Sequence, residues 1–384
     1  MLAISRRANS RRLLFVGYGR TGESPFIRTK SVRHEPLGLA RTLFMLFFLF
    51  VDKMMLVWYY FIMNIKKDFA LMIKTKNIFI SILAVFCAII LTVTSLGGCN
   101  FSTDTTDKVF EINDTLTDGQ NKKATVILLG GQSNASGCSL DSYLQKNVSE
   151  EKYAEYANGY DNVYINYYAT GNNESKAFVK CKTGQGEPGC FGPELGLAEK
   201  LNELYPDQLF FIIKCAWGGT NLYKQWLSPS SLGVTGQLYK EFVNFVDTSL
   251  NYLTSKNYDV NIEAMCWMQG ESDSILPITA VTYKINLNNF IKDIRKQFSS
   301  YAPADGIAFV DAFIANTPKL WLHCNIINAK KQAVANESPL NVVVDTSILT
   351  CSEEPTETPD LAHYDSLSQI KLGQLFAEQI VHFL

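Results

Sequence analysis

One serine of this 384-residue chain stands where it could act as a nucleophile. Ser133 lies in the run Gly-Gly-Gln-Ser-Asn, directly after residues 125–129, an apolar segment with the pattern of a buried strand. Small residues after a strand permit a sharp turn, which would expose the serine at the carboxyl end of that strand. A hydroxyl alone is a weak nucleophile, so a base must come from elsewhere in the chain. From this motif alone, an ordinary Gly/Ser/Asn turn remains the alternative.

The best candidate for the base is His363, in the run Asp360-Leu-Ala-His363. This spacing can place the carboxylate beside the imidazole, where it would fix the histidine tautomer and stabilise the imidazolium. The chain has three other histidines. His34 lies in the N-terminal leader, His382 is next to the C-terminus, and His323 is in a Trp-Leu-His-Cys run typical of packed structure. A loop histidine without a role is the alternative for His363.

A third motif follows the apolar segment 209–214 and reads Ala-Trp-Gly-Gly-Thr-Asn. Its glycines, Gly218 and Gly219, would let backbone N–H groups approach a ligand closely, as an oxyanion hole requires. A Gly-Gly pair is more often only a turn. The neighbouring Trp217 could face a sugar ring or belong to the core.

A fourth motif, Trp-Met-Gln-Gly-Glu-Ser-Asp, covers residues 267–273 and again lies at the end of an apolar run. The Gln269 amide could donate a hydrogen bond to a developing oxyanion. Glu271 and Asp273 could be catalytic acids, or could instead satisfy backbone and loop donors.

The elements that must position these motifs alternate along the chain from residue 125 onward. Strands are expected at 125–129, 162–167, 209–214, 262–268, 307–314 and 341–345, and helices at 193–204, 238–253, 281–298, 328–335 and 366–383. This alternation predicts an α/β fold with a parallel sheet covered by helices on both faces. Ligands of such sheets bind beyond the carboxyl ends of the strands, where three of the motifs fall.

These motifs together resemble the SGNH-hydrolase superfamily, and specifically the branch with carbohydrate esterase family six and the sialate O-acetylesterases. The resemblance also includes the run Phe-Gly-Pro-Glu at residues 191–194 and covers about residues 124 to 384. It implies a three-layer α/β/α, flavodoxin-like fold with a central parallel sheet of about five strands, and no metal or organic cofactor. Met268 departs from this pattern, because relatives often have a polar residue at that position. The departure affects the expected substrate contacts rather than the catalytic residues.

Position by position, the resemblance implies Ser133 as nucleophile, His363 as general base and then acid, and Asp360 as the group that orients it. An oxyanion hole would form from the Ser133 N–H, an N–H of Gly218 or Gly219, and the Gln269 side chain. Residues assigned to possible substrate contact or support are Gln132, Asn134, Trp217, Glu271 and Asp273.

Charge is divided unevenly along the chain. Residues 1–98 hold 14 of the 35 Lys and Arg but 4 of the 37 Asp and Glu, so the remainder has 21 basic and 33 acidic residues. An acidic body argues against a nucleic-acid surface, which needs clustered Lys and Arg. Eight of the nine arginines fall within residues 6–41, a composition foreign to the rest, so residues 1–71 are a doubtful N-terminal extension.

Residues 72–98 have a basic start and a long apolar run, as in an export signal. The run ends in Leu-Gly-Gly-Cys99, which resembles the lipobox of bacterial lipoproteins and implies lipid modification of Cys99. A transmembrane anchor is the alternative. Residues 99–123 are polar and predict a flexible tether, with an esterase domain over 124–384. In the cell envelope, Cys181 could pair with Cys190, and Cys324 with Cys351.

The function expected from these observations is that of an exported serine esterase that removes O-acetyl groups from carbohydrate, such as acetylated xylan or O-acetylated sialic acid. Two alternatives stay open: an SGNH acyl hydrolase acting on lipid or peptidoglycan, and a surface lipoprotein that binds glycan without hydrolysing it. Acetate release separates the enzyme from the binder, and acyl-chain preference separates the two esterases.

Overall fold

A computed structural model of the chain describes residues 12–15, 28–31, 108–353 and 359–384. Near the N-terminus, β1 (Arg12–Phe15) pairs antiparallel with β2 (Arg28–Ser31). The expected signal segment 72–98 and the lipid site Cys99 lie outside the described residues, as does the rest of the doubtful extension 1–71. Among the helices that the structure does describe, none is both long and apolar enough for a membrane span.

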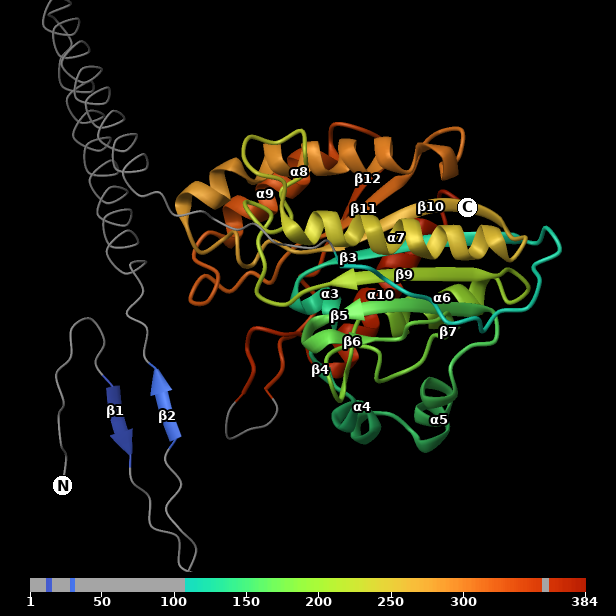
Figure 1. Cartoon of the computed structure of the whole chain (residues 1–384), viewed down its shortest axis with the longest axis horizontal. Helices are drawn as coiled ribbons and strands as arrows, with labels where there is room; N and C mark the ends of the chain where they lie inside the picture. Colours follow the sequence, from blue (N-terminus) through green and yellow to red (C-terminus); the bar gives the residue numbers. More distant parts are fainter. Residues whose placement is uncertain (1–11, 16–27, 32–107, 354–358) are drawn as a thin grey trace, which may run out of the picture. The chain divides into compact units, whose positions relative to one another are not determined.

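The body of the protein, residues 105–384, is built on one sheet (Figure 1). Six parallel strands form it in the order β12-β11-β10-β3-β9-β5, and the short strands β6 and β7 pair antiparallel with β5. Their bounds are β3 (Lys123–Gly131), β5 (Val163–Ala169), β6 (Asn173–Glu174), β7 (Val179–Lys180), β9 (Phe210–Ala216), β10 (Asp259–Met268), β11 (Ala308–Ala312) and β12 (Asn341–Val344). All six strands expected from the sequence are present, one more than the five implied by the resemblance.

Helices cover both faces of this sheet. On one face lie α7 (Gln237–Ser255) and α8 (Pro277–Gln297), with α9 (Cys324–Ala335) beside α8. On the other face α6 (Glu194–Leu204) packs against α10 (Ser366–Ile380). These five helices match the expected ones, and the three-layer α/β/α class is confirmed. Two short helices, α4 (Asp141–Asn147) and α5 (Glu150–Asn158), and the two-residue strands β4 (Ser139–Leu140) and β8 (Cys190–Phe191) are additional.

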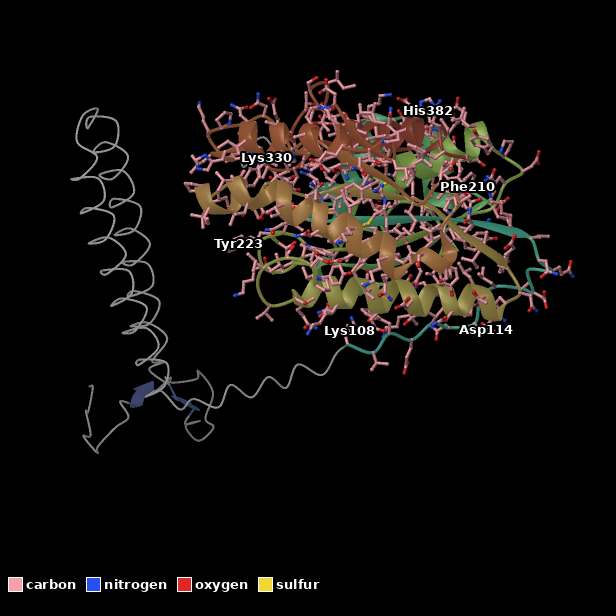
Figure 2. All side chains as sticks on the ribbon, turned by 90° about the horizontal axis from the view of Figure 1, so that it is seen from above. Lys108, Asp114, Phe210, Tyr223, Lys330 and His382 are labelled. Atoms are coloured by element: carbon pink, nitrogen blue, oxygen red, sulfur yellow. The ribbon has the colours of Figure 1, made fainter. Side chains whose placement is uncertain are left out.

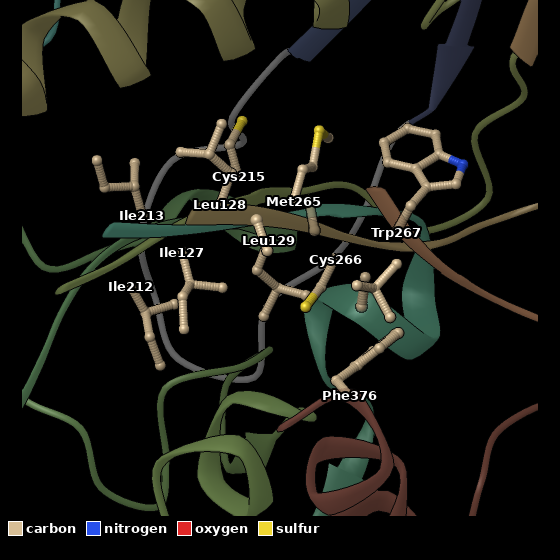
Figure 3. Packing of buried hydrophobic residues seen from close by; sticks show 14 of the residues in the cluster. Ile127, Leu128, Leu129, Ile212, Ile213, Cys215, Met265, Cys266, Trp267 and Phe376 are labelled. Atoms are coloured by element: carbon tan, nitrogen blue, oxygen red, sulfur yellow. The ribbon is translucent and has the colours of Figure 1, made fainter. Parts of the chain in front are cut away.

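The core consists of two apolar layers, one on each side of the sheet, because the central strands are buried on both faces. Figure 3 shows Leu128 and Trp267 on one side, and Leu129 and Phe376 on the other. The Trp267 ring packs against Phe290 of α8 at a centroid distance of 4.6 Å. Burial on both faces explains why the strands read in the sequence as continuous apolar runs rather than as alternating ones.

Residues 108–122 are packed on the domain, which differs from the expected flexible tether over 99–123. Figure 2 shows this segment running from Lys108 to Asp114 along α7. The Tyr252 hydroxyl of α7 donates to Asp114 Oδ1 at 2.9 Å, and Phe110 and Leu116 are only 8% and 9% exposed. The polar composition of the segment gave no indication that Phe110 and Leu116 would be buried.

All seven cysteines of the described body are free thiols, so the expected pairs Cys181–Cys190 and Cys324–Cys351 are absent from this part of the structure. Four of these side chains belong to the apolar core, namely Cys181, Cys215, Cys266 and Cys324, although the Cys324 thiol also contacts Asn316 Oδ1 at 3.3 Å. Buried thiols of this kind behave as small apolar side chains.

Candidate active site

Ser133 lies at the carboxyl end of the central strand β3, as the first residue of the short helix α3 (Ser133–Ser136). The turn requires glycine at 131, where φ is +138° and a Cβ would lie 2.0 Å from the Met268 carbonyl oxygen of β10. The serine is 8% exposed. The neighbouring Gln132 is buried, and its Oε1 accepts from the N–H groups of Gly270 and Ser272, so Gln132 has a supporting role.

His363 and Asp360 form the second part of the site. His363 Nδ1 lies 2.6 Å from Asp360 Oδ2, and the Ala362 N–H also donates to the Asp360 carboxylate. With Nδ1–H donating to the carboxylate, Nε2 is the ring nitrogen left to act as a base. Both side chains are partly exposed, so they are open to a substrate.

Asn134 joins these two parts of the site. Its Oδ1 accepts from the N–H of Tyr364 at 3.2 Å, so the residue after the serine binds the residue after the histidine. Its Nδ2 donates to Glu271 Oε1 at 2.9 Å, and its backbone oxygen accepts from Gln369 of α10. Ser139 Oγ donates to the Tyr364 carbonyl oxygen at 2.7 Å. The loop that carries His363 is therefore held at both backbone polar groups of Tyr364, its N–H and its carbonyl oxygen.

The glycine pair after β9 lies next to the serine. A Cβ on Gly218 would be 3.5 Å from Ser133 Cβ. The Gly218 N–H donates to Thr170 Oγ1 at 2.7 Å, so this N–H already has a partner. Gly219 has φ of +69°, and within residues 108–353 and 359–384 neither its N–H nor that of Ser133 donates a hydrogen bond. Two unpaired backbone donors beside a nucleophile can stabilise an oxyanion.

Gln269 lies in a different environment from the one expected of an oxyanion donor. Its side chain is 0% exposed. Its Nε2 lies within hydrogen-bond distance of three protein acceptors, at 2.6 Å from Asp273 Oδ2, 3.1 Å from the Thr220 carbonyl oxygen and 3.2 Å from Gln132 Oε1. The Tyr283 hydroxyl donates to its Oε1. This geometry disagrees with the expected donation to substrate, because an amide has only two N–H groups and both have internal acceptors.

Glu271 and Asp273 are buried acceptors rather than exposed acids. Asp273 accepts from the N–H groups of Leu222 and Tyr223, which fixes the loop after β9 against the end of β10. Burial raises the pKa of Asp273 to about 6. Burial also raises the pKa of Glu271 above its ordinary value, although the hydrogen bond from Asn134 opposes that shift.

The two tryptophans differ in exposure. Trp267 is 0% exposed in the core, whereas Trp217 is partly exposed and its ring meets Tyr168 edge-on at a centroid distance of 5.1 Å. Trp217 therefore remains the candidate for substrate contact. A cavity of about 520 Å³ opens elsewhere, between β5, β7 and residues 182–185, and none of the expected site residues lines it.

Several residues of the site were not identified from the sequence. Thr170, Ser139 and Tyr364 form hydrogen bonds between segments far apart in the chain, and no motif marks them. Glu187 lies outside all of the motifs described from the sequence. Among the residues that the structure describes, no group of three or more His, Cys, Asp or Glu side chains could hold a metal ion.

Comparison with protein families gives one match, over residues 123–382, to the family described as carbohydrate esterase, sialic acid-specific acetylesterase. The match spans every part of the site, from β3 to the end of α10. None of the curated proteins compared with the sequence matches it.

Solved structures of similar fold have low sequence identity to this chain. A protein from Arabidopsis thaliana is 17% identical, with a TM-score of 0.48 over 68% of this chain and 99% of that protein. NanS is 16% identical, with a TM-score of 0.49 over 70% of this chain and 99% of NanS. A carbohydrate acetylesterase from Xanthomonas citri is 16% identical, with a TM-score of 0.47 over 67% of this chain and 56% of that protein.

Proposed function

Because the chain belongs to the family of carbohydrate esterases described as sialic acid-specific acetylesterases, we propose that it removes O-acetyl groups from carbohydrate with Ser133 as nucleophile, His363 as base and Asp360 as the group that orients the base. The observation that supports this assignment most directly is the hydrogen bond from the Tyr364 N–H to Asn134 Oδ1, which brings the serine and histidine motifs together.

The first step is acylation. Asp360 accepts the Nδ1 proton of His363, so Nε2 takes the proton of the Ser133 hydroxyl while Oγ attacks the acetyl carbonyl carbon. The oxyanion of the tetrahedral intermediate accepts hydrogen bonds from the N–H groups of Ser133 and Gly219. Its collapse breaks the ester bond, and the sugar alcohol leaves with the proton from His363.

The second step is hydrolysis of the acetyl-serine. His363 Nε2 takes a proton from water as the water oxygen attacks the acetyl carbon. The same proton then passes to Ser133 Oγ as the bond between Oγ and the acetyl carbon breaks, and acetic acid leaves and ionises in solution. Gln269 and Asp273 contribute by holding the glycine loop and the Gln132 turn in place, because their hydrogen bonds connect the ends of β3, β9 and β10.

The chain is also proposed to be an exported lipoprotein of a bacterial cell envelope, anchored to the membrane through lipid on Cys99. The basic and apolar run before Leu-Gly-Gly-Cys supports this proposal. Mass spectrometry of the protein from its natural source would find an N-terminal diacylglyceryl cysteine at 99. An N-terminus upstream of Cys99 without lipid contradicts the proposal.

Acetate release from acetylated sugars tests the proposed activity. We expect release from acetylated xylo-oligosaccharides or O-acetylated sialic acid, and a fall in kcat of about a thousandfold or more in Ser133→Ala. The exposed Ser300, which follows α8, offers a matched Ser300→Ala control that keeps full activity. Equal kcat in Ser133→Ala removes Ser133 from the mechanism. Release only from long-chain esters, or from no ester, favours the lipid hydrolase or the glycan-binding lipoprotein.

A further inference from the structure

The carboxylate of Glu187 lies beside the nucleophile, although the esterase mechanism gives it no role. Its Oε1 is 3.2 Å from the position of a Cβ on Gly218, and that position is 3.5 Å from Ser133 Cβ. The distance between Glu187 Oε1 and Ser133 Cβ is therefore less than the total of these two separations. Cys138, whose Sγ lies 3.1 Å from Glu187 Oε1, also contacts the Ser133 carbonyl oxygen.

The loop that carries Glu187 is fixed from several sides. The Glu187 N–H donates to the Gly137 carbonyl oxygen at 2.8 Å, and its own carbonyl oxygen accepts from the Cys190 N–H. Two residues earlier, the Gln185 carbonyl oxygen accepts from Lys214 Nζ, which also forms a buried ion pair with Glu194 at 2.7 Å. The position of the Glu187 carboxylate next to Ser133 is thus determined by the fold.

This carboxylate has hydrogen-bonding capacity that the protein does not use. Its only side-chain partner among residues 108–353 and 359–384 is the thiol of Cys138, and within those residues it forms no ion pair. A thiol is a weak donor, whereas an ionised carboxylate offers about four acceptor positions. Sugar hydroxyl groups are donors that would fill the remaining acceptor positions of the carboxylate.

Two carboxylates act on Cys138, whose thiol contacts the Ser133 carbonyl oxygen. Burial raises the pKa of the Cys138 thiol, and the nearby carboxylates of Glu187 and Asp360 raise it further. Arginine is the side chain best suited to bind a carboxylate through two parallel hydrogen bonds. Arg295, the only arginine after residue 98, donates instead to the carbonyl oxygens of Ile307 and Leu340 at the amino ends of β11 and β12, the edge opposite Ser133.

We infer, on the basis of the proposed function, that Glu187 determines specificity by accepting hydrogen bonds from the hydroxyl groups of the acetylated sugar and by repelling sugars that carry a carboxylate. The substrate class is therefore a neutral acetylated sugar that keeps free hydroxyl groups beside the ester. An acidic sugar such as sialic acid is disfavoured although the family description names it.

The test compares two substrates that differ in one charge and one methyl group: 9-O-acetyl-N-acetylneuraminic acid and its methyl ester, with an acetylated xylo-oligosaccharide as the neutral reference. Acetate release by the full chain gives kcat/KM for each. We expect wild type to favour the methyl ester over the acid by about threefold to tenfold at low salt, the size expected of one charge pair in a partly hydrated cleft. Added NaCl should bring this ratio toward one, because exposed charges are screened.

The variant Glu187→Gln keeps the shape and removes the charge. We expect it to bring the ratio of methyl ester to acid close to one at low salt and to lower kcat/KM for the xylo-oligosaccharide by about threefold or more, since an amide oxygen is a weaker acceptor. Glu203→Gln is the matched control, because Glu203 is an exposed carboxylate at the end of α6 with Lys200 as its partner. It should keep the wild-type ratio.

Equal kcat/KM of wild type for the acid and its methyl ester overturns the inference while leaving the esterase intact. A ratio in Glu187→Gln equal to that of wild type also overturns the role of Glu187. Release of acetate from none of the three substrates overturns the proposed function, and with it this inference. The wild-type comparison needs no variant, so it holds even if Glu187→Gln folds poorly.

Discussion

Asn134 connects the serine motif to the histidine loop, although a sequence motif identifies it only as the neighbour of Ser133. Its side chain serves as acceptor for the Tyr364 N–H and as donor to Glu271, so it links α3 to both the histidine loop and the end of β10. The separation of Ser133 from His363 thus depends on an amide that takes no part in the proton transfers.

Asn134→Ala is expected to lose both stability and rate. The change leaves the buried Tyr364 N–H and the Glu271 carboxylate without this partner, at a cost of about 2–4 kcal/mol in the free energy of unfolding. We expect kcat to fall at least tenfold, because the histidine loop is no longer held beside the serine. Urea unfolding and acetate release measure the two effects.

Glu271→Gln is the companion to that variant. Its amide oxygen still accepts from Asn134 Nδ2 and its buried charge is gone, so it should lose less than Asn134→Ala on both measures. An Asn134→Ala protein with wild-type kcat and unchanged unfolding free energy would show that the link does not position His363.

At the scale of elements, three strand ends are connected beneath the site by buried polar groups. The ends of β3, β9 and β10 contribute Gln132, the loop after Ala216, and Gln269 with Asp273. Thr170, which follows β5, extends this connection to a fourth strand through its hydrogen bond from Gly218. The catalytic geometry is a property of the sheet edge as a whole.

Asp273 should make stability depend on pH. Burial raises its pKa from 3.8 to about 6 in the folded state, so the folded state prefers the protonated form more strongly than the unfolded chain does. The stabilising contribution is complete below pH 3.8 and is lost as pH rises through 6. Relative to Asp273→Asn, which does not titrate, the unfolding free energy of wild type should fall by about 3 kcal/mol between these values.

Urea unfolding of both proteins at several pH values from 3.5 to 7 measures this difference. The comparison cancels the groups that the two proteins share. A difference between them that stays constant, or that grows with pH, would show that the three hydrogen bonds to Asp273 outweigh its burial.

At the scale of the whole molecule, the domain begins earlier than its first strand. Residues 108–122 run along α7, and Phe110 meets Tyr168 and Phe245 edge-on at centroid distances of 5.2 and 5.0 Å. Because Tyr168 in turn contacts Trp217, the segment supports the residue that precedes the glycine turn.

Removal of this segment should destabilise the domain. A fragment of residues 123–384 loses the burial of Phe110 and Leu116, and we expect its free energy of unfolding to be about 2–4 kcal/mol below that of residues 105–384. Urea unfolding of the two fragments measures the effect. Phe110→Ala in the longer fragment should lower the free energy of unfolding by part of the same difference. Equal unfolding free energies would mean that the segment contributes no stability.

The sequence by itself determined the succession of strands and helices along the chain, the three-layer class and the residues proposed as nucleophile, base and orienting acid. These properties are local. A strand buried on both faces reads as an apolar run, and the separation of three positions between Asp360 and His363 allows their contact wherever the loop lies. Each motif at a strand end could be assigned to one edge because parallel strands share their direction.

Only the tertiary structure decided which polar groups face the substrate and which face one another. The Gln269 amide, expected to donate to the oxyanion, lies among acceptors of Gln132, Thr220 and Asp273, and Glu187 lies in a loop without a motif. Asn134 and Tyr364 are 230 positions apart in the chain. The partner of each polar side chain depends on which loops contact one another at the edge of the sheet. The spacing of residues along the sequence does not indicate those contacts.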